Sequence, residues 1–238
     1  YIDHDGQRLN NGQLNIKAFN FTLFDNDALD PEYVESIVKA TPSGMFTDRD
    51  IYGRWVAAEG IVYKDFDQAK HLLTPEQIKQ ANMVTYFAGV DWGYEHYGAI
   101  VVVGQDDQGS YYLLEEYATQ HEEIDYWVDI AKGIKARYGN ILFYCDSARP
   151  EHVSRFRREG LRARNADKAV LSGIEVVARG FKQNKLFVAN TAKRFKDEIY
   201  MYVWNDKTGE PVKQFDDVLD ALRYALYTHS KGSVFSFD

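Results

Sequence analysis

The sequence predicts an α/β fold in which a mixed β-sheet is flanked by helices. Three strand-like segments follow one another between residues 84 and 119, and short apolar strands alternate with amphipathic helices after residue 120. Strands joined by tight turns run antiparallel, whereas strands joined through a helix run parallel, so a sheet built from both connections is mixed. The 238 residues are enough for one such domain and a smaller appended segment.

Residues 1–80 are expected to form a linker or wrapping arm, and residues 81–238 the folded domain. Apolar residues are scattered in the first segment, which gives it no core of its own. Asp30 and Pro31 predict a helix start, because aspartate caps helix N-termini and proline is tolerated at the first helical position. Residues 53–66 are expected to form a short hairpin. The chain opens on Tyr1 rather than methionine, so we expect it to be part of a longer protein.

The elements of the domain are predicted from hydrophobic periodicity and turn residues. An apolar run between turn signals indicates a buried strand, and apolar residues three and four apart indicate a helix packed on one face. The polar residues 105–109 predict a hairpin turn. Strands are expected at residues 84–91, 98–105, 110–119, 140–147, 161–163 and 185–190. Helices are expected at residues 122–138, 149–159, 170–181, 192–204 and 217–228.

Composition excludes several classes of protein. With 45% hydrophobic and 27% charged residues, the chain is globular rather than intrinsically disordered. The single cysteine, Cys145, excludes an internal disulfide framework. The apolar runs are too short to cross a bilayer, so no membrane partner is expected.

Positive charge is concentrated in one segment of an acidic chain. The formal net charge is −8, yet residues 149–168 hold seven basic and three acidic side chains. An overall acidic balance argues against a nucleic-acid coat protein. A local basic stretch can still bind a polyanion, especially beside metal ions held by carboxylates.

Aspartates stand where strands and a helix end or begin. Asp91 ends the strand at 84–91 and Asp146 lies near the end of the strand at 140–147, and open α/β sheets bind ligands at this edge. Asp217 and Asp220 begin the last helix and share one of its faces. Each aspartate alone can serve as a turn or capping residue. If they converge, their repulsion requires a cation, and hard oxygen ligands favour Mg²⁺ or Mn²⁺.

Three motifs in this order resemble the C-terminal nuclease domain of the tailed-bacteriophage terminase large subunit, in its Bacillus siphophage lineage. They are GVDWG, YCDSARP and FDDVLDALRYALYTH. The resemblance covers residues 84–230, and residues 15–66 resemble the segment that joins the packaging ATPase to the nuclease. It implies an RNase H-like fold, divalent-metal-dependent DNA endonuclease activity, and a role in cutting concatemeric viral DNA for packaging.

When the residues are matched to the family's motifs, the resemblance implies that Asp91, Asp146 and Asp217 are catalytic metal ligands. It implies Asp220 as a further ligand. Relatives often carry Asp-His-Ala-x-Asp-Ala at the last motif, and this chain has Asp217 at the histidine. The choice among Asp216, Asp217 and Asp220 therefore stays open. The implied chemistry is phosphodiester hydrolysis with two ions, Mg²⁺ or Mn²⁺, both bound by Asp91.

The basic segment after Asp146 is the candidate contact with double-stranded DNA, through phosphates rather than bases. A solvated helix face is the alternative for each of its side chains. The candidates are Arg149, Arg155, Arg158, Arg162, Arg164 and Lys168. For the full-length protein, the resemblance implies the terminase small subunit and the portal or procapsid as partners, in the host cytoplasm during virion assembly. No GxxxxGK[ST] loop occurs, so ATP hydrolysis is not expected.

Three other functions share part of these features. An actin-like phosphotransferase would need a second glycine-rich D-x-G loop, and YCDSARP contains no glycine. An RNase H-like resolvase or transposase would share the metal chemistry and differ in substrate. A non-catalytic DNA-binding or capsid-docking module would use the aspartates only as caps.

Overall fold

A seven-stranded sheet forms the centre of the protein, seen here in a computed structural model that describes residues 19, 21–54 and 60–234. Its strand order is β1-β7-β4-β3-β2-β5-β6. The strands are β1 (Leu72–Leu73), β2 (Met83–Asp91), β3 (Gly98–Asp106), β4 (Tyr111–Thr119), β5 (Leu142–Cys145), β6 (Arg162–Asn165) and β7 (Leu186–Ala189). Strands β2, β3 and β4 are antiparallel, and the remaining pairs are parallel, so the predicted mixed sheet is confirmed.

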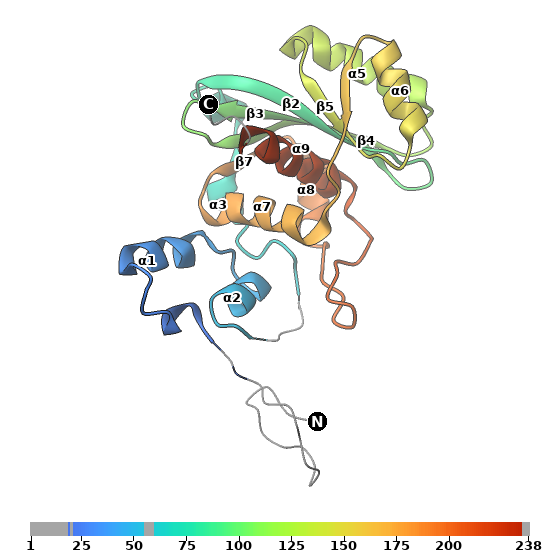
Figure 1. The fold of residues 1–238 in the computed structure, drawn as a ribbon. Helices are drawn as coiled ribbons and strands as arrows, with labels where there is room; N and C mark the ends of the chain where they lie inside the picture. The colour runs from blue at the N-terminus through green and yellow to red at the C-terminus, as the bar shows by residue number, and fades with distance from the viewer. Residues whose placement is uncertain (1–18, 20, 55–59, 235–238) are drawn as a thin grey trace.

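Helices cover both faces of this sheet (Figure 1). Helices α5 (Ile124–Tyr138) and α6 (Pro150–Arg158) pack on the face that carries Ala88 and Val90. Helices α7 (Val170–Lys182) and α9 (Asp217–Val234), with α8 (Lys193–Glu198), pack on the face that carries Phe87. Side chains alternate between the two faces of a strand, so β2 contributes to both cores and is shielded on both sides.

Helix α9 lies directly on β2. A Cβ atom added at Gly89 would come within 1.9 Å of the backbone oxygen of Ala221, so this approach requires glycine. Gly89 and Asp91 share a face of the sheet because they are two residues apart. Asp217 lies one helical turn before Ala221. The contact at Gly89 therefore places the first turn of α9 close to the end of β2.

The N-terminal segment contributes to the same core. It contains the 3₁₀ helix η1 (Leu23–Asp25) and helices α1 (Pro31–Ala40), α2 (Met45–Asp50), α3 (Gln68–His71) and α4 (Pro75–Ile78). The predicted start of α1 is confirmed, since the Asp30 carboxylate accepts the backbone N–H of Glu32 at 2.8 Å. Tyr63 and Phe66 are buried against residues of the domain, and β1 pairs with β7. The division at residue 80 stays a prediction.

Two expected elements differ from the structure. The described part of residues 53–66 contains no hairpin, and residues 55–59 lie outside the described residues. The helix expected at 192–204 is limited to α8. Beyond it the chain turns to pair with the N-terminal segment, since Val62 donates its N–H to the oxygen of Tyr202 at 2.9 Å. Bonds between distant segments replace the local helical bonds there.

No helix in the described part of the chain is long and apolar enough to cross a membrane.

Candidate metal centre

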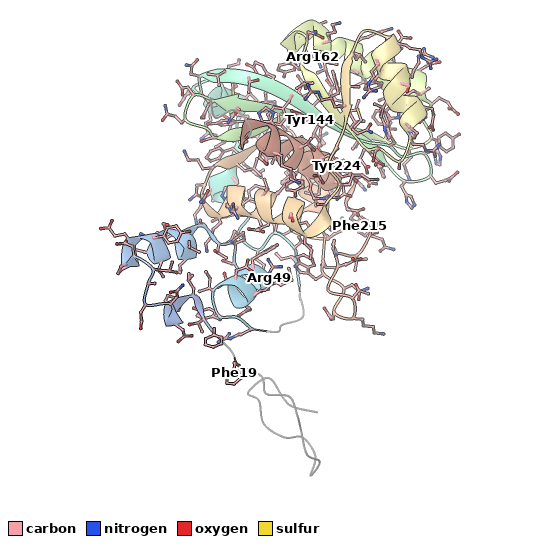
Figure 2. All side chains as sticks on the ribbon, in the orientation of Figure 1. Phe19, Arg49, Tyr144, Arg162, Phe215 and Tyr224 are labelled. Atoms are coloured by element: carbon pink, nitrogen blue, oxygen red, sulfur yellow. The ribbon has the colours of Figure 1, made fainter. Side chains whose placement is uncertain are left out.

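The carboxylates of Asp91 and Asp146 stand at the ends of two neighbouring strands. Strands β2 and β5 are parallel and pair Gly89 with Tyr144 and Val90 with Cys145. The pairing continues one step further, because the N–H of Asp146 donates to the oxygen of Val90 at 2.8 Å. Both aspartates therefore lie at one edge of the sheet, on the face covered by α9. Figure 2 labels Tyr144 on β5 and Tyr224 on α9, two elements that contribute to this region.

Helix α9 and the residue directly before it, Asp216, add three more carboxylates beside Asp91. Burial raises the pKa of Asp91 well above its ordinary value, and the negative charges of Asp220, Asp146, Asp217 and Asp216 raise it further. Burial and the charges of Asp220 and Asp217 also raise the pKa of Asp216 to about 6. Burial raises the pKa of Asp217, against the opposing effect of Arg194. Repulsion between anions thus contributes to the shifts of Asp91 and Asp216, whereas burial is what raises the pKa of Asp217.

Three cations pair with three of these aspartates. Lys168 Nζ lies 2.6 Å from Asp146 Oδ1. Arg194 Nη2 lies 3.2 Å from Asp217 Oδ2.

The third pair is the most buried. Arg223 is 3% exposed, and its Nη2 lies 2.7 Å from Asp220 Oδ2. Arg223 also donates to the backbone oxygen of Lys168 at 3.3 Å, which fixes it between α9 and the start of α7. Asp220 is therefore held as the partner of a buried guanidinium. Asp216 and Asp217 are held less firmly by an internal cation than Asp220 is.

No cation or hydrogen-bond donor among the described residues contacts the carboxylate of Asp91, and Asp216 has no cation partner there either. Within the same residues, no three carboxylate, histidine or cysteine side chains are arranged to coordinate one ion as the protein stands. Three carboxylates of the cluster are instead paired with cations of the protein, namely Asp146 with Lys168, Asp217 with Arg194 and Asp220 with Arg223. The donor set itself, an unpartnered Asp91 surrounded by carboxylate oxygens, suits a hard divalent ion.

The loop after Asp91 packs against β5 and α6 through Trp92. Trp92 donates its indole N–H to the backbone oxygen of Asp146 at 2.9 Å. Its ring lies edge-on to Phe156 and to His152. Trp92 thus ties the ends of β2 and β5 together, which helps to keep the two strand-end aspartates adjacent.

The structure separates the six basic candidates into two groups. Arg162 and Arg164 lie on β6 opposite Leu142 and Tyr144, hence on the sheet face that carries the aspartates. The others belong to α6 or to the segment before α7. Arg149, Arg155 and Arg158 are on α6 or at its start, and α6 covers the opposite face.

Three of the six candidates are already engaged in ion pairs. One is Lys168, the partner of Asp146. Arg155 pairs with Asp125 at 2.9 Å and with Glu159 at 3.0 Å. The third pair, between Arg149 and Glu151, is longer, at 3.9 Å, and both of its side chains are exposed.

The two candidates without a partner lie on opposite faces of the sheet. Arg158 on α6 and Arg164 on β6 are exposed, and neither has a partner among the described residues. Contact with DNA stays a prediction for all six.

The sequence reasoning missed Arg194, Glu198 and Arg223. All three lie on predicted helices, where a charged residue reads as part of a solvated face. The hydrophobic pattern holds one signal for Arg223, since it directly follows Leu222 inside the apolar ending of the chain. Glu198 carries a similar signal, because it lies three residues after Phe195 and four before Tyr202, on the apolar face of the predicted helix. Arg194 carries none, since its partial burial results from the packing of α8 on α9.

The mixed sheet flanked by helices is the RNase H-like fold of large-terminase nuclease domains. Among solved structures, the large terminase from a thermophilic bacteriophage shares 27% identity with this chain, with a TM-score of 0.75. The match covers 88% of this chain and 53% of that one, so the chain spans about half the length of that large terminase. The predicted resemblance to bacteriophage large terminases is thereby confirmed, while the Bacillus lineage stays a prediction.

Isolated nuclease domains of large terminases show the same fold. That of bacteriophage P22 matches 72% of this chain and 93% of its own, at 19% identity and a TM-score of 0.61. That of SPP1, solved with bound Mn, matches 65% of this chain and 91% of its own, at 20% identity and a TM-score of 0.52. The G20c nuclease was solved with bound cobalt. No protein-family model and no curated protein matches the chain.

Proposed function

We propose that this chain is the nuclease part of a phage large terminase, a divalent-metal-dependent endonuclease that cuts concatemeric viral DNA during genome packaging. The observation that carries the proposal is the position of Asp91. It ends a central strand, faces Asp146 and the first turn of α9, and has no cation partner among the described residues. Burial and the neighbouring anions disfavour the charged form of this carboxylate, and a cation from outside the protein would favour it.

Asp91, Asp146 and Asp217 are the residues proposed to hold the metal, with Asp216 as the nearest alternative. Asp220 ranks behind them because Arg223 already occupies it. Divalent ions bound there would activate water and neutralise the charge that develops on the phosphodiester. Two ions, Mg²⁺ or Mn²⁺, are proposed, and the metals in the SPP1 and G20c nucleases support a divalent cofactor.

The protein's own groups have defined roles in this proposal. The backbone bond from Asp146 to Val90 and the indole of Trp92 hold the two strand-end carboxylates together. Arg162 and Arg164 would bind the phosphates of double-stranded DNA on the same face of the sheet. Lys168 and Arg194 neutralise Asp146 and Asp217 when no metal is bound, which reduces repulsion in the empty site.

The remaining assignments rest on the resemblance of the sequence motifs and concern the whole protein. The terminase small subunit and the portal or procapsid are proposed as partners of the full-length protein. The host cytoplasm during virion assembly is its proposed location. Residues 1–80 are proposed as the segment that follows the packaging ATPase.

Incubation with supercoiled plasmid tests the nuclease directly. The chain, with Mn²⁺ or Mg²⁺, is expected to nick and linearise the plasmid, and EDTA is expected to abolish cutting. Asp91→Asn and Asp146→Asn are each expected to reduce the rate at least about 100-fold, since a carboxylate that binds the metal has no neutral substitute. Asp197→Asn, on the exposed side of α8, is the control. Absence of both cleavage and metal binding in the unmodified chain would contradict the proposal.

A further inference from the structure

Glu198 is a charged side chain in a fully buried position. It ends α8 and is 0% exposed. Burial raises its pKa to about 7. A buried carboxylate is costly unless several donors satisfy it. The partners of Glu198 therefore indicate what the residue is for.

Two of these partners are backbone groups in the first turn of α9. Glu198 Oε2 accepts the N–H of Val218 at 2.9 Å and that of Leu219 at 3.1 Å. Helix N-termini present N–H groups that lack intrahelical acceptors, and a negative charge there is favourable. Glu198 thus caps α9 from a neighbouring helix, at the residues that directly follow Asp217.

The third partner links Glu198 to the carboxylate of Asp217 itself. Arg194 donates Nε to Glu198 Oε1 at 2.7 Å, and its Nη2 reaches Asp217 Oδ2 at 3.2 Å. The guanidinium also lies 3.9 Å from the centre of the Tyr97 ring, which limits its motion. A guanidinium is planar and rigid, so one Arg can bridge two carboxylates in a defined geometry.

We propose that Glu198 is a positioning residue of the metal centre. It sets the place of Asp217 in two ways, through the backbone of the following residues and through Arg194. The inference rests on the proposed function, because it assigns Glu198 a role toward the metal that Asp217 would bind. Partners behind metal ligands commonly change metal affinity 10- to 100-fold when they are removed.

The test is metal titration of Glu198→Gln. Glutamine keeps the size and loses the charge, so the N–H groups of Val218 and Leu219 lose their anionic acceptor. Arg194 then has Asp217 as its remaining carboxylate partner. The Kd for Mn²⁺, measured by calorimetry well below the unfolding temperature, is expected to rise about tenfold. Hydrogen exchange at the amides of Val218 and Leu219 is expected to accelerate.

Glu116→Gln is the matched control. Glu116 on β4 accepts the N–H groups of Arg194 and Phe195 at 2.6 and 2.9 Å, so it caps α8 as Glu198 caps α9. It makes no hydrogen bond to α9 among the described residues. The control is expected to lower the unfolding temperature while changing the Kd less than about threefold, below the range for partners of metal ligands. Equal effects of both variants on the Kd, or an unchanged Kd in Glu198→Gln, would overturn the inference.

A second variant covers the case in which Glu198→Gln does not fold. Glu198→Asp keeps the charge that compensates Arg194 but shortens the side chain by one methylene, out of reach of the α9 amides. The same rise in Kd is expected, and an unchanged Kd would overturn the inference. Failure of the proposed function is distinguishable, since the unmodified chain would then bind no Mn²⁺ in the same titration.

Discussion

The ammonium group of Lys168 lies 2.6 Å from the carboxylate of Asp146, although the two residues belong to different connections of the sheet. Asp146 follows β5, and Lys168 lies between β6 and α7. The side chain of Asp146 is 10% exposed and that of Lys168 is 38% exposed, so the pair is partly shielded from solvent. Lys168 thus holds a carboxylate that the proposed metal would also need.

Removal of this lysine is expected to strengthen metal binding. In Lys168→Met the metal no longer competes with an internal cation for Asp146. A partly exposed ion pair contributes up to about 1 kcal/mol, so the Kd for Mn²⁺ in the absence of DNA should fall up to about fivefold. Calorimetric titration measures this. Lys231→Met is the control, because Lys231 forms an ion pair of equal length with Asp167. An unchanged or weaker affinity in Lys168→Met would show that Lys168 does not compete with the ion.

Substitution of Gly89 is expected to separate α9 from the sheet. In Gly89→Ala the new Cβ meets the backbone oxygen of Ala221 at 1.9 Å, and backbone cannot rotate away as a side chain can. The free energy of unfolding should fall by about 3 kcal/mol, and Mn²⁺ affinity should fall with it. Urea denaturation and metal titration measure the two effects.

Gly104→Ala on β3 provides the comparison for Gly89. Its new Cβ would meet side-chain atoms of Met83 and Leu114, which are flexible. A smaller loss of stability and an unchanged metal affinity are expected. If both variants lose the same stability and the same affinity, the contact between Gly89 and Ala221 does not place the α9 carboxylates.

The contribution of the buried carboxyls to the stability of the metal-free protein is expected to fall as pH rises through the range 4–7. The pKa of Asp216 is raised to about 6 and that of Glu198 to about 7, and the pKa of Asp91 is also raised. In this window these three carboxyls bind more protons in the folded protein than in the unfolded chain, so their contribution to the free energy of unfolding decreases with pH. The contribution is largest below the unfolded pKa values and is lost above the folded ones.

Melting temperatures with and without Mn²⁺ test this dependence. Because metal ligands must be deprotonated, the stabilisation by Mn²⁺ should be greater at pH 8 than at pH 5.5. Asp91→Asn removes one anion from the cluster and should raise the metal-free melting temperature at pH 8 by about 3 °C, the shift that 1 kcal/mol produces in a domain of this size. A lower melting temperature in this variant would mean that Asp91 is already compensated in the metal-free protein.

Arginines on the two sides of the sheet are expected to differ in DNA binding. Arg164 lies on β6 opposite Tyr144, on the face of the aspartates, and Arg158 lies on α6 at the other face. Both are exposed and have no partner among the described residues, so their substitution by alanine removes similar local interactions. Arg164→Ala should weaken binding to a DNA duplex and lower the salt dependence by about one phosphate contact.

Arg158→Ala is the matched control and should leave both quantities nearly unchanged. Titrations with labelled duplex over a series of salt concentrations supply the slopes. A larger effect of Arg158→Ala would place the DNA on the α6 side, away from the carboxylate cluster.

Local patterns in the sequence determined the positions of most strands and helices, including the strand ends at which Asp91 and Asp146 lie. Strand periodicity and turn residues are local signals, so the antiparallel strands β2, β3 and β4 and the helices α5, α6 and α7 lie close to their predicted places. The ordered motifs indicated the nuclease fold, because they mark the ends of elements that meet at one edge of the sheet. The same signals predicted a helix at 192–204, where contacts with the N-terminal segment end it early.

Only the tertiary structure decided which charged groups face one another. Lys168 meets Asp146 because the chain segments after β6 and β5 lie side by side, and Arg194 meets Asp217 because α8 lies against α9. Arg223 and Asp220 share one helix at i,i+3 spacing, and there the tertiary structure decided the burial of the pair. Glu198 lies on the apolar face of its predicted helix with Phe195 and Tyr202, but only the packing of α8 on α9 showed which groups its carboxylate meets. Charge pairing depends on distances across the fold, and spacing along the chain carries no information about such distances unless the residues share one helix or strand.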